Sequence, residues 1–328
     1  MTSTKDELTH IVERFKGQPV LVVGDLILDQ FVWGHVRRVS PEAPVPVVEV
    51  VEETIHLGGA ANVAANLSVL GAQPILIGLL GQDEAGNQLI AELENQGINT
   101  EAIIRDETRM TTIKTRILAH QKQICRTDRE NTESLDEKLQ KEFFKICSNC
   151  FEQVQSVILS DYSKGVLHLP LVQNLIKKCR EYGKFISVDP KLDDFSAYHQ
   201  ASVITPNVEE LRRASGTKIA NESALVEVGQ QLLTRAELDY LLVTRGEEGM
   251  TLFEGDSFSH IPTVAQEVYD VTGAGDTVVA CLTLAVTAGA SVHQAAILAN
   301  HAAGIVIGKL GTATVTPEEI LFSIKNKG

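Results

Sequence analysis

Residues 156–189, SVILSDYSKGVLHLPLVQNLIKKCREYGKFISVD, contain two short apolar runs with an amphipathic stretch between them. The runs at 156–161 and 184–189 are almost continuously apolar, which is typical of strands buried on both faces of a sheet. The stretch at 169–182 has the length and apolar spacing of a helix. Strand, helix and strand in this order predict two parallel strands joined by a crossover helix.

The same alternation extends in both directions along the chain. Further strands are expected at 19–25, 74–80, 202–205 and 239–244, and further helices at 58–70, 208–214 and 222–235. This order predicts one α/β domain over 1–328, with a mostly parallel sheet between two layers of helices. Ligands bind such sheets beyond the carboxyl ends of the strands. The residues expected at those ends are Asp25, Asp161, Asp189, Thr205 and Thr244.

Two parts of the chain interrupt the alternation. Residues 30–38 and 45–53 look extended with no helix between them, and 111–119 and 122–128 look like a hairpin that turns near His120-Gln121. We expect a small second sheet, built from about 30–55 and 108–128, that acts as a lid and keeps water from the reacting groups. Residues 45–51 have apolar side chains on both faces, which predicts a homodimer made through the lid.

Composition and charge exclude several classes of protein. The net charge of −14 would repel nucleic acid and anionic membrane surfaces. The polar first ten residues carry no apolar signal region, and no apolar run is long enough to span a bilayer, so we expect a cytoplasmic protein. Five cysteines, an odd number, fit a reducing compartment, and we interpret Cys147 and Cys150 as packed thiols on a helix.

The most informative motif is DVTGAGD at 270–276, followed by a long apolar stretch that predicts a buried helix. Glycines at a helix start let the backbone approach an anion, which the free N–H groups and the helix dipole stabilise. Asp276 at the same end could accept a hydroxyl proton. The alternative is an ordinary helix start with an N-cap aspartate. The chain contains neither a P-loop motif nor, after its first strand, a dinucleotide-binding fingerprint.

A second small-residue motif, GGAANVAAN, stands at 58–66. Backbone N–H groups at this glycine pair, and the amide of Asn62, could bind sugar hydroxyls. The alternative is that the small residues serve only tight packing of a helix on the sheet.

Together, Gly58-Gly59-x-x-Asn62 and the motif at 270–276 resemble the two signatures of the ribokinase-like (PfkB) carbohydrate kinases. The resemblance covers essentially the whole chain. Thr205-Pro-Asn207-x-x-Glu210 and Thr244-Arg-Gly246-x-x-Gly249 resemble that family's magnesium and nucleotide regions. Cys281 stands where relatives usually have Ala or Gly. The resemblance implies a three-layer α/β/α kinase with a β-sheet lid that uses ATP and Mg²⁺.

The resemblance also implies roles for individual residues. Asp276 matches the catalytic base, and the backbone of Gly273, Ala274 and Gly275 matches the anion hole for the transferring phosphoryl group. Asp29, Gly58, Gly59 and Asn62 match the sugar site; Asn207 and Glu210 match residues that organise Mg²⁺, through water; and Thr244, Gly246 and Gly249 border the nucleotide with Asn207. In relatives that use a monovalent cation such as K⁺, the equivalents of Asp270 and Thr272 supply ligands.

Within this family, the runs SPEAPVPVVEV, LGGAANVAANL, SDYSKG, VDPK, EVYDVTGAGDTV and GKLGTATV resemble the heptose 7-phosphate kinases of lipopolysaccharide-core synthesis. That resemblance implies phosphorylation of D-glycero-β-D-manno-heptose 7-phosphate at the anomeric oxygen. Many such kinases are fused to an adenylyltransferase, but the chain has no HxGH motif, so we expect a stand-alone kinase or an isolated kinase domain.

A sugar phosphate requires cationic partners. Lys164 and Lys191 follow expected strands and are the first candidates, and Arg116 and Arg126 on the lid hairpin, with Lys114, are the next. Any single basic residue could instead serve surface solvation. Two other functions stay open at this point: a kinase of the same fold with another sugar, sugar phosphate or nucleoside, and a non-catalytic sugar-phosphate-binding protein.

Overall fold

The computed structural model describes residues 4–120, 122–265, 268–309 and 311–327. An eight-stranded sheet forms the middle layer of the body, in the order β14-β13-β12-β11-β10-β9-β1-β4. Its strands are β1 (Pro19–Gly24), β4 (Gln73–Ile77), β9 (Ser156–Ser160), β10 (Phe185–Asp189), β11 (Val203–Ile204), β12 (Tyr240–Thr244), β13 (Met250–Glu254) and β14 (Ser257–Ile261). The strands from β4 to β12 pair in parallel, and β13 and β14 add an antiparallel edge. The predicted α/β class with a mostly parallel sheet is therefore confirmed.

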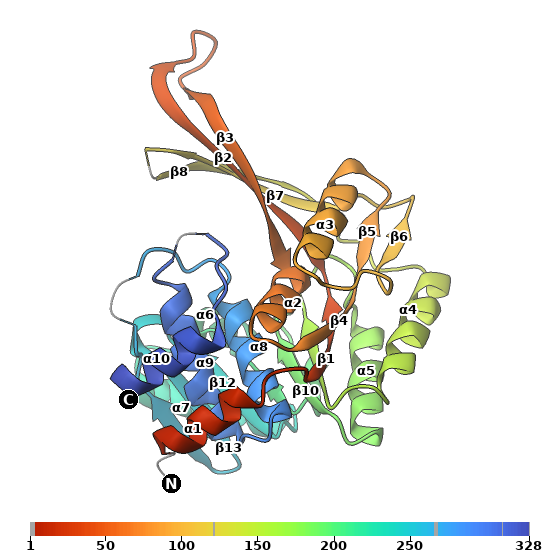
Figure 1. The fold of residues 1–328 in the computed structure, drawn as a ribbon, viewed down its shortest axis with the longest axis vertical. Coiled ribbons are helices and arrows are strands. Elements are labelled where there is room, and N and C mark those ends of the chain that lie inside the picture. The colour runs from red at the N-terminus through yellow and green to blue at the C-terminus, as the bar shows by residue number, and fades with distance from the viewer. Residues whose placement is uncertain (1–3, 121, 266–267, 310, 328) are drawn as a thin grey trace.

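Helices cover both faces of this sheet (Figure 1). Alternate residues of β1 enter two separate cores: Val20 and Val22 pack in one, Leu21 and Val23 in the other. Such alternation is the expected consequence of a strand buried on both faces. The helices are α1 (Lys5–Glu13), α2 (Ala60–Val69), α3 (Glu84–Asn95), α4 (Glu137–Cys150), α5 (Leu169–Glu181), α6 (Val208–Ser215), α7 (Glu222–Arg235), α8 (Ala274–Thr287), α9 (Val292–Val306) and α10 (Pro317–Lys327). The first core contains residues of α1, α2, α8, α9 and α10, and the second contains residues of α4, α5 and α7, among them the buried Cys147.

A four-stranded sheet projects from the body (Figure 1). We call it the outer sheet; it consists of β2 (Leu26–Val39), β3 (Pro46–Gly59), β7 (Thr112–Ala119) and β8 (Lys122–Arg129), in the order β3-β2-β7-β8. The two pieces of chain that were expected to form a small sheet do so. The expected hairpin is present as the antiparallel pair β7 and β8, and Gln121 at its turn lies outside the described residues.

Two of the differences between the predicted elements and the structure lie at glycines. The helix expected over 58–70 begins only at Ala60, because β3 continues to Gly59, which has φ 59° and stands where a Cβ would lie 2.4 Å from the Asp25 carbonyl oxygen. The strand expected over 74–80 is two strands. At Gly78, where a Cβ would lie 2.5 Å from Leu26 Cγ, the chain leaves β4 and forms β5 (Leu79–Gly81), which pairs with β6 (Ile104–Asp106).

Candidate active site

Asp276 lies in the first turn of α8 and is almost fully buried, with 3% of its surface exposed. The helix starts after Gly273, which has the left-handed φ of 77° and no side-chain cap. A Cβ at Gly273 would lie 2.8 Å from Asn62 Nδ2, so a side chain there would disturb the neighbouring helix. Ala274 donates its N–H to the Val271 carbonyl at 3.2 Å, and the other N–H groups at the start of this turn, which no side chain caps, remain available to an anion.

Two side chains donate hydrogen bonds to Asp276, one to each carboxylate oxygen. Asn62 Nδ2 lies 2.7 Å from Oδ2, and the hydroxyl of Tyr162 lies 2.8 Å from Oδ1. Burial raises the pKa of Asp276 to about 6, against the effect of these two hydrogen bonds; the charge of Asp29 also raises the pKa, and that of Lys114 lowers it. Asp276 is thus ionised at neutral pH and is a stronger base than an exposed aspartate.

Asp29 of β2 is buried beside Gly58 of β3. A Cβ at residue 58 would lie 2.4 Å from Asp29 Oδ2, so the first glycine of the pair makes room for this carboxylate. Arg116 of β7 donates to Asp29 Oδ1, and its guanidinium also lies over the Phe31 ring, 5.2 Å from the centroid. The outer sheet therefore supplies a carboxylate and a guanidinium to the site that α2 and α8 form.

Further basic residues surround Tyr162. Lys114 Nζ lies 5.1 Å from the centroid of the Tyr162 ring, and burial lowers the pKa of this lysine. Lys164 forms an ion pair with Glu130 at 2.7 Å. Arg126 lies directly across from Arg116 in the β7–β8 register and pairs with Asp128. Each of the two arginines thus has a carboxylate partner, Asp29 for Arg116 and Asp128 for Arg126.

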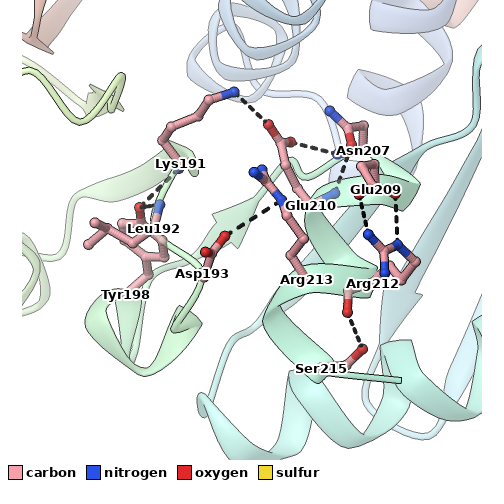
Figure 2. Close-up of polar contacts among 10 residues, drawn as sticks. All are labelled: Lys191, Leu192, Asp193, Tyr198, Asn207, Glu209, Glu210, Arg212, Arg213 and Ser215. Atoms are coloured by element: carbon pink, nitrogen blue, oxygen red, sulfur yellow. Dashed lines mark hydrogen bonds and ion pairs between the residues drawn. The ribbon is translucent and has the colours of Figure 1, made fainter. Parts of the chain in front are cut away.

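A cavity of about 150 Å³ lies at the carboxyl ends of the central strands and adjoins this site, since Tyr162 and Gly275 are among its lining residues. Its lining residues are Asp161, Tyr162, Asp189, Pro190, Lys191, Thr205, Asn207, Glu210, Thr244 and Gly275. Figure 2 shows Lys191 reaching Glu210, at 3.1 Å, and the mutual cap between Asn207 and Glu210 at the start of α6. Lys191 and Lys164, which were expected to bind the same phosphate, thus have different partners.

Two further carboxylates of this cavity lie where β9 and β10 end: Asp161 directly follows β9, and Asp189 is the last residue of β10. Burial raises the pKa of Asp161 to about 6, although the Tyr198 hydroxyl donates to it at 2.7 Å. Burial also raises the pKa of Asp189 well above its usual range, and the charges of Asp276 and Glu210 add to this effect. In the part of the chain that the structure describes, no three acidic, His or Cys side chains are grouped closely enough to hold a metal ion. Both aspartates were expected at strand ends from the sequence.

The other residues expected at the nucleotide and cation sites lie on later segments of the chain. Thr244 bridges to Asn207, and Gly246 begins the short helix that ends before Gly249. Gly249 has φ 84°, and a Cβ there would lie 2.1 Å from the Ile261 carbonyl oxygen. Asp270 accepts the backbone N–H groups of Thr272 and Gly311; burial raises the pKa of Asp270, but hydrogen bonds outweigh this and leave the pKa below its usual value.

Comparison with known proteins agrees with this arrangement. A family model described as "pfkB family carbohydrate kinase" matches residues 19–319. The chain belongs to the pfkB family of carbohydrate kinases. Among curated pfkB relatives, it is 43% identical over 317 residues to the "Bifunctional protein HldE" of Desulfatibacillum aliphaticivorans, covering 96% of this chain and 65% of the relative. It is 44% identical over 301 residues to the protein of the same name from Helicobacter pylori, covering 92% of this chain and 65% of the relative. The chain thus spans just under two thirds of these relatives.

Solved structures show the same pfkB fold at low sequence identity. A ribokinase of Arabidopsis thaliana, solved with ribose and ATP, has a TM-score of 0.76 and 20% identity, covering 94% of this chain and 99% of its own. Phosphofructokinase-2 of Escherichia coli, solved with potassium, has a TM-score of 0.79 and 15% identity, covering 94% and 98%. These likenesses confirm the predicted ribokinase-like fold.

Proposed function

We propose that the chain transfers the terminal phosphoryl group of ATP to the anomeric oxygen of D-glycero-β-D-manno-heptose 7-phosphate. The product would be the 1,7-bisphosphate, an intermediate of ADP-heptose synthesis for the lipopolysaccharide core. The observation that carries the proposal is the buried Asp276, which is held by Asn62 and Tyr162 at an open helix N-terminus. The sequence runs that resemble heptose 7-phosphate kinases support this substrate.

The chemistry follows from the positions of these groups. Asp276 accepts the proton of the O1 hydroxyl, O1 forms its bond to the γ-phosphorus, and the bond between that phosphorus and the β,γ-bridging oxygen breaks to release ADP. The N–H groups of Gly273 and Gly275, joined by that of Ala274 when it leaves the Val271 carbonyl, stabilise the charge on the transferring oxygens. Asp29 with Arg116 would orient sugar hydroxyls, with the Gly58-Gly59 turn beside them.

The charge of the sugar phosphate requires cations near the acceptor side. Lys114, Arg116 and Lys164 lie around Tyr162 and Asp29, and Arg126 extends this group along β8. We propose this basic group as the binding site of the 7-phosphate. Lys191 shares its cavity with Asn207, Glu210 and Thr244, which supports a role on the nucleotide side.

The Glu210 carboxylate and the Asn207 amide are proposed to organise a magnesium ion through water, because oxygen donors of this kind suit Mg²⁺ and no three of the described acidic, His or Cys side chains are grouped closely enough to hold it directly. Bound Mg²⁺ would neutralise charge on the ATP phosphates. Asp270 and Thr272 are proposed as ligands of a monovalent cation such as K⁺, in line with the potassium named for the phosphofructokinase-2 structure.

We further propose a cytoplasmic homodimer in which the outer sheet serves as lid and as interface. Val39, Val45, Val50 and Val51 of the outer sheet and its tip are exposed apolar residues, and a partner's sheet could cover them. In the part of the chain that the structure describes, no helix is both long and apolar enough to cross a membrane.

A sugar panel tests the proposed reaction. The full chain is incubated with ATP and Mg²⁺ and with heptose 7-phosphate, unphosphorylated heptose, fructose 1-phosphate, tagatose phosphate or a nucleoside. Phosphorus NMR then identifies the phosphorylated position, with Asp276→Asn as the control for contaminating kinases. We expect turnover of heptose 7-phosphate at O1. If another acceptor is phosphorylated faster, that acceptor is the substrate. If no acceptor is phosphorylated, the chain is a non-catalytic binding protein.

A further inference from the structure

Tyr162 touches the proposed base but belongs to neither of the two signature motifs. Its hydroxyl donates to Asp276 Oδ1 at 2.8 Å, while Asn62 donates to Oδ2 at 2.7 Å. An ionised carboxylate can accept about four hydrogen bonds, so each oxygen keeps a lone pair for an acceptor hydroxyl. One donor on each oxygen fixes the rotation of the carboxylate as well as its position.

The backbone of Tyr162 is held by a buried carboxylate. Asp25, at the end of β1 and 1% exposed, accepts the N–H groups of Tyr162 at 2.9 Å, Lys164 at 3.1 Å and Val166 at 3.2 Å. All three donors belong to the loop that follows β9. Between them Ser163 adopts φ 55°, a conformation that a non-glycine residue keeps only where its surroundings impose it. The loop is therefore fixed on the body of the protein.

Contacts from the outer-sheet side complete this arrangement. Lys114 of β7 covers the tyrosine ring. Arg109 donates to the carbonyl oxygens of Lys164, at 3.1 Å, and Glu133, at 2.7 Å, and so joins the loop to the segment after β8. A tyrosine needed only for packing would not require a hydroxyl aimed at a buried aspartate.

We infer that Tyr162 is a positioning residue for the proposed base, and that the Asp25 carboxylate holds the loop from which it acts. The inference rests on the proposed function in one respect, which is that Asp276 is the base. It adds a residue that the family motifs do not include and gives Asp25 a role beyond its place at a strand end.

The effect of the hydroxyl on Asp276 can be separated from that of the other groups around it. The charge of Asp29 of β2 raises the pKa of Asp276, that of Lys114 of β7 lowers it, and Asn62 of α2 is the second hydrogen-bond donor; Asp189 of β10, whose own pKa is raised by burial, also interacts with Asp276. Removing the Tyr162 hydroxyl leaves these groups in place. Because that hydroxyl stabilises the ionised form, its loss should raise the pKa of Asp276 and move the acid limb of activity to higher pH.

The test uses Tyr162→Phe in the full chain, with Tyr182→Phe as the matched control, because Tyr182 lies at the far end of α5 and is exposed. The carboxyl carbon of Asp276 is followed by ¹³C NMR during a pH titration, in protein labelled at aspartate, and is assigned by its absence in Asp276→Asn. We expect a higher pKa for Asp276 in Tyr162→Phe and no change in Tyr182→Phe. An unchanged Asp276 titration in Tyr162→Phe would overturn the inference, even if thermal stability fell.

Kinetics with heptose 7-phosphate give a second readout. We expect kcat at pH 7 to fall about 10- to 100-fold in Tyr162→Phe, the size of effect that follows loss of one hydrogen bond to a charged group, with the KM for ATP unchanged. Should Tyr162→Phe fail to fold, 3-fluorotyrosine at position 162 keeps the hydroxyl as a stronger donor and should lower the pKa of Asp276 instead. If the wild-type chain does not phosphorylate heptose 7-phosphate but the NMR shift is found, the substrate proposal fails while the positioning role stands.

Discussion

Asn62 donates its side-chain amide to Asp276 across 2.7 Å, although 214 positions separate the two residues in the chain. One turn further along, the Thr277 hydroxyl donates to Asn66 at 2.9 Å, so α2 and α8 are joined by two buried polar contacts. Buried polar groups of this kind favour a single arrangement, because each would be left unsatisfied in any other. The two signature motifs of the sequence therefore meet in one hydrogen-bonded pair.

Replacing Asp276 by Asn should remove catalysis and preserve ATP binding. The amide cannot accept the O1 proton, and loss of a general base typically costs ~10²–10⁴ in rate. The nucleotide would be held by the start of α8 and by strand ends, which the substitution leaves intact. Turnover and calorimetric titration with ATP measure the two properties. Near-normal turnover would mean that another residue is the base.

Activity should fall at acid pH as Asp276 becomes protonated. Burial raises the pKa of Asp276 to about 6, so the apparent pKa of the acid limb should lie near this value. The base works in its ionised form, so the rate is full above this pKa and decreases roughly tenfold per pH unit below it. Asp161 also has a pKa of about 6, so its contribution must be separated. The kcat/KM profile of Asp161→Asn should keep the acid limb; a limb that disappears in this variant would assign it to Asp161.

Lys164→Ala and Lys191→Ala should affect different substrates. Lys164 lies with the basic group near the acceptor side, so its loss should raise the KM for the sugar phosphate, whereas Lys191 shares the cavity of Glu210 and its loss should raise the KM for ATP. Loss of a charge-assisted hydrogen bond to phosphate costs about 1.5–3 kcal/mol, or about 10- to 150-fold. The control Glu130→Gln removes the partner of Lys164 but keeps its charge. A shift in the same KM for both lysines would place them at one phosphate.

Activity should require Mg²⁺ and should be sensitive to Glu210. Glu210→Gln keeps the size of the side chain and a carbonyl oxygen that can accept from the Asn207 N–H, but it removes the charge that a divalent ion needs. We expect no activity in excess EDTA, and a higher Mg²⁺ concentration for half-maximal rate in the variant. The matched control is Glu209→Gln, on the exposed side of the same turn. Full activity in EDTA would contradict the prediction.

The outer sheet should hold two copies of the chain together. Val51 is 68% exposed in the single chain, and a lysine in its place would be buried against the partner without a counter-charge. Sedimentation velocity should therefore find a dimer for the wild type and a shift toward monomer for Val51→Lys. Phe322→Lys replaces an equally exposed residue, at 71%, on α10 of the body, and should leave the mass unchanged. A wild-type monomer at all concentrations would exclude this assembly.

Much of the body could be predicted from local pattern. The helix expected at 222–235 has those bounds in α7, and β9, β10 and β12 differ from their predicted ranges by one residue. These elements contain continuous apolar runs or a clear helical periodicity. Both patterns can be recognised from neighbouring residues in the sequence alone.

What could not be predicted depends on contacts between distant residues. The end of β3 at Gly59 is set by the carbonyl of Asp25, and the partner of Lys191 is set by the position of α6, which carries Glu210 and packs on β12 and α7. Tyr162 stands in a run, SDYSKG, that indicates only a loop after a strand. Its contact with Asp276 follows from the packing of α8 against the sheet, a relation that no local spacing contains. The only indication in the sequence was that Tyr162 directly follows Asp161, a residue expected at the end of a strand.

β3 ends at Gly59 and α2 begins at Ala60, so no connecting residue separates the outer sheet from the helix that holds Asn62. The opposite end of the same strand pair differs, because residues 40–45 join β2 to β3 as an exposed connection at the tip. The number of residues is therefore fixed at the Gly59–Ala60 junction but can vary in the connection at the tip. Insertions are tolerated where a connection is exposed, so a peptide inserted within 41–44 should leave the active site intact and disturb only the proposed dimer contact at Val39 and Val45. One residue added at the strand-to-helix junction would turn α2 by about 100° and carry the Asn62 amide away from the base.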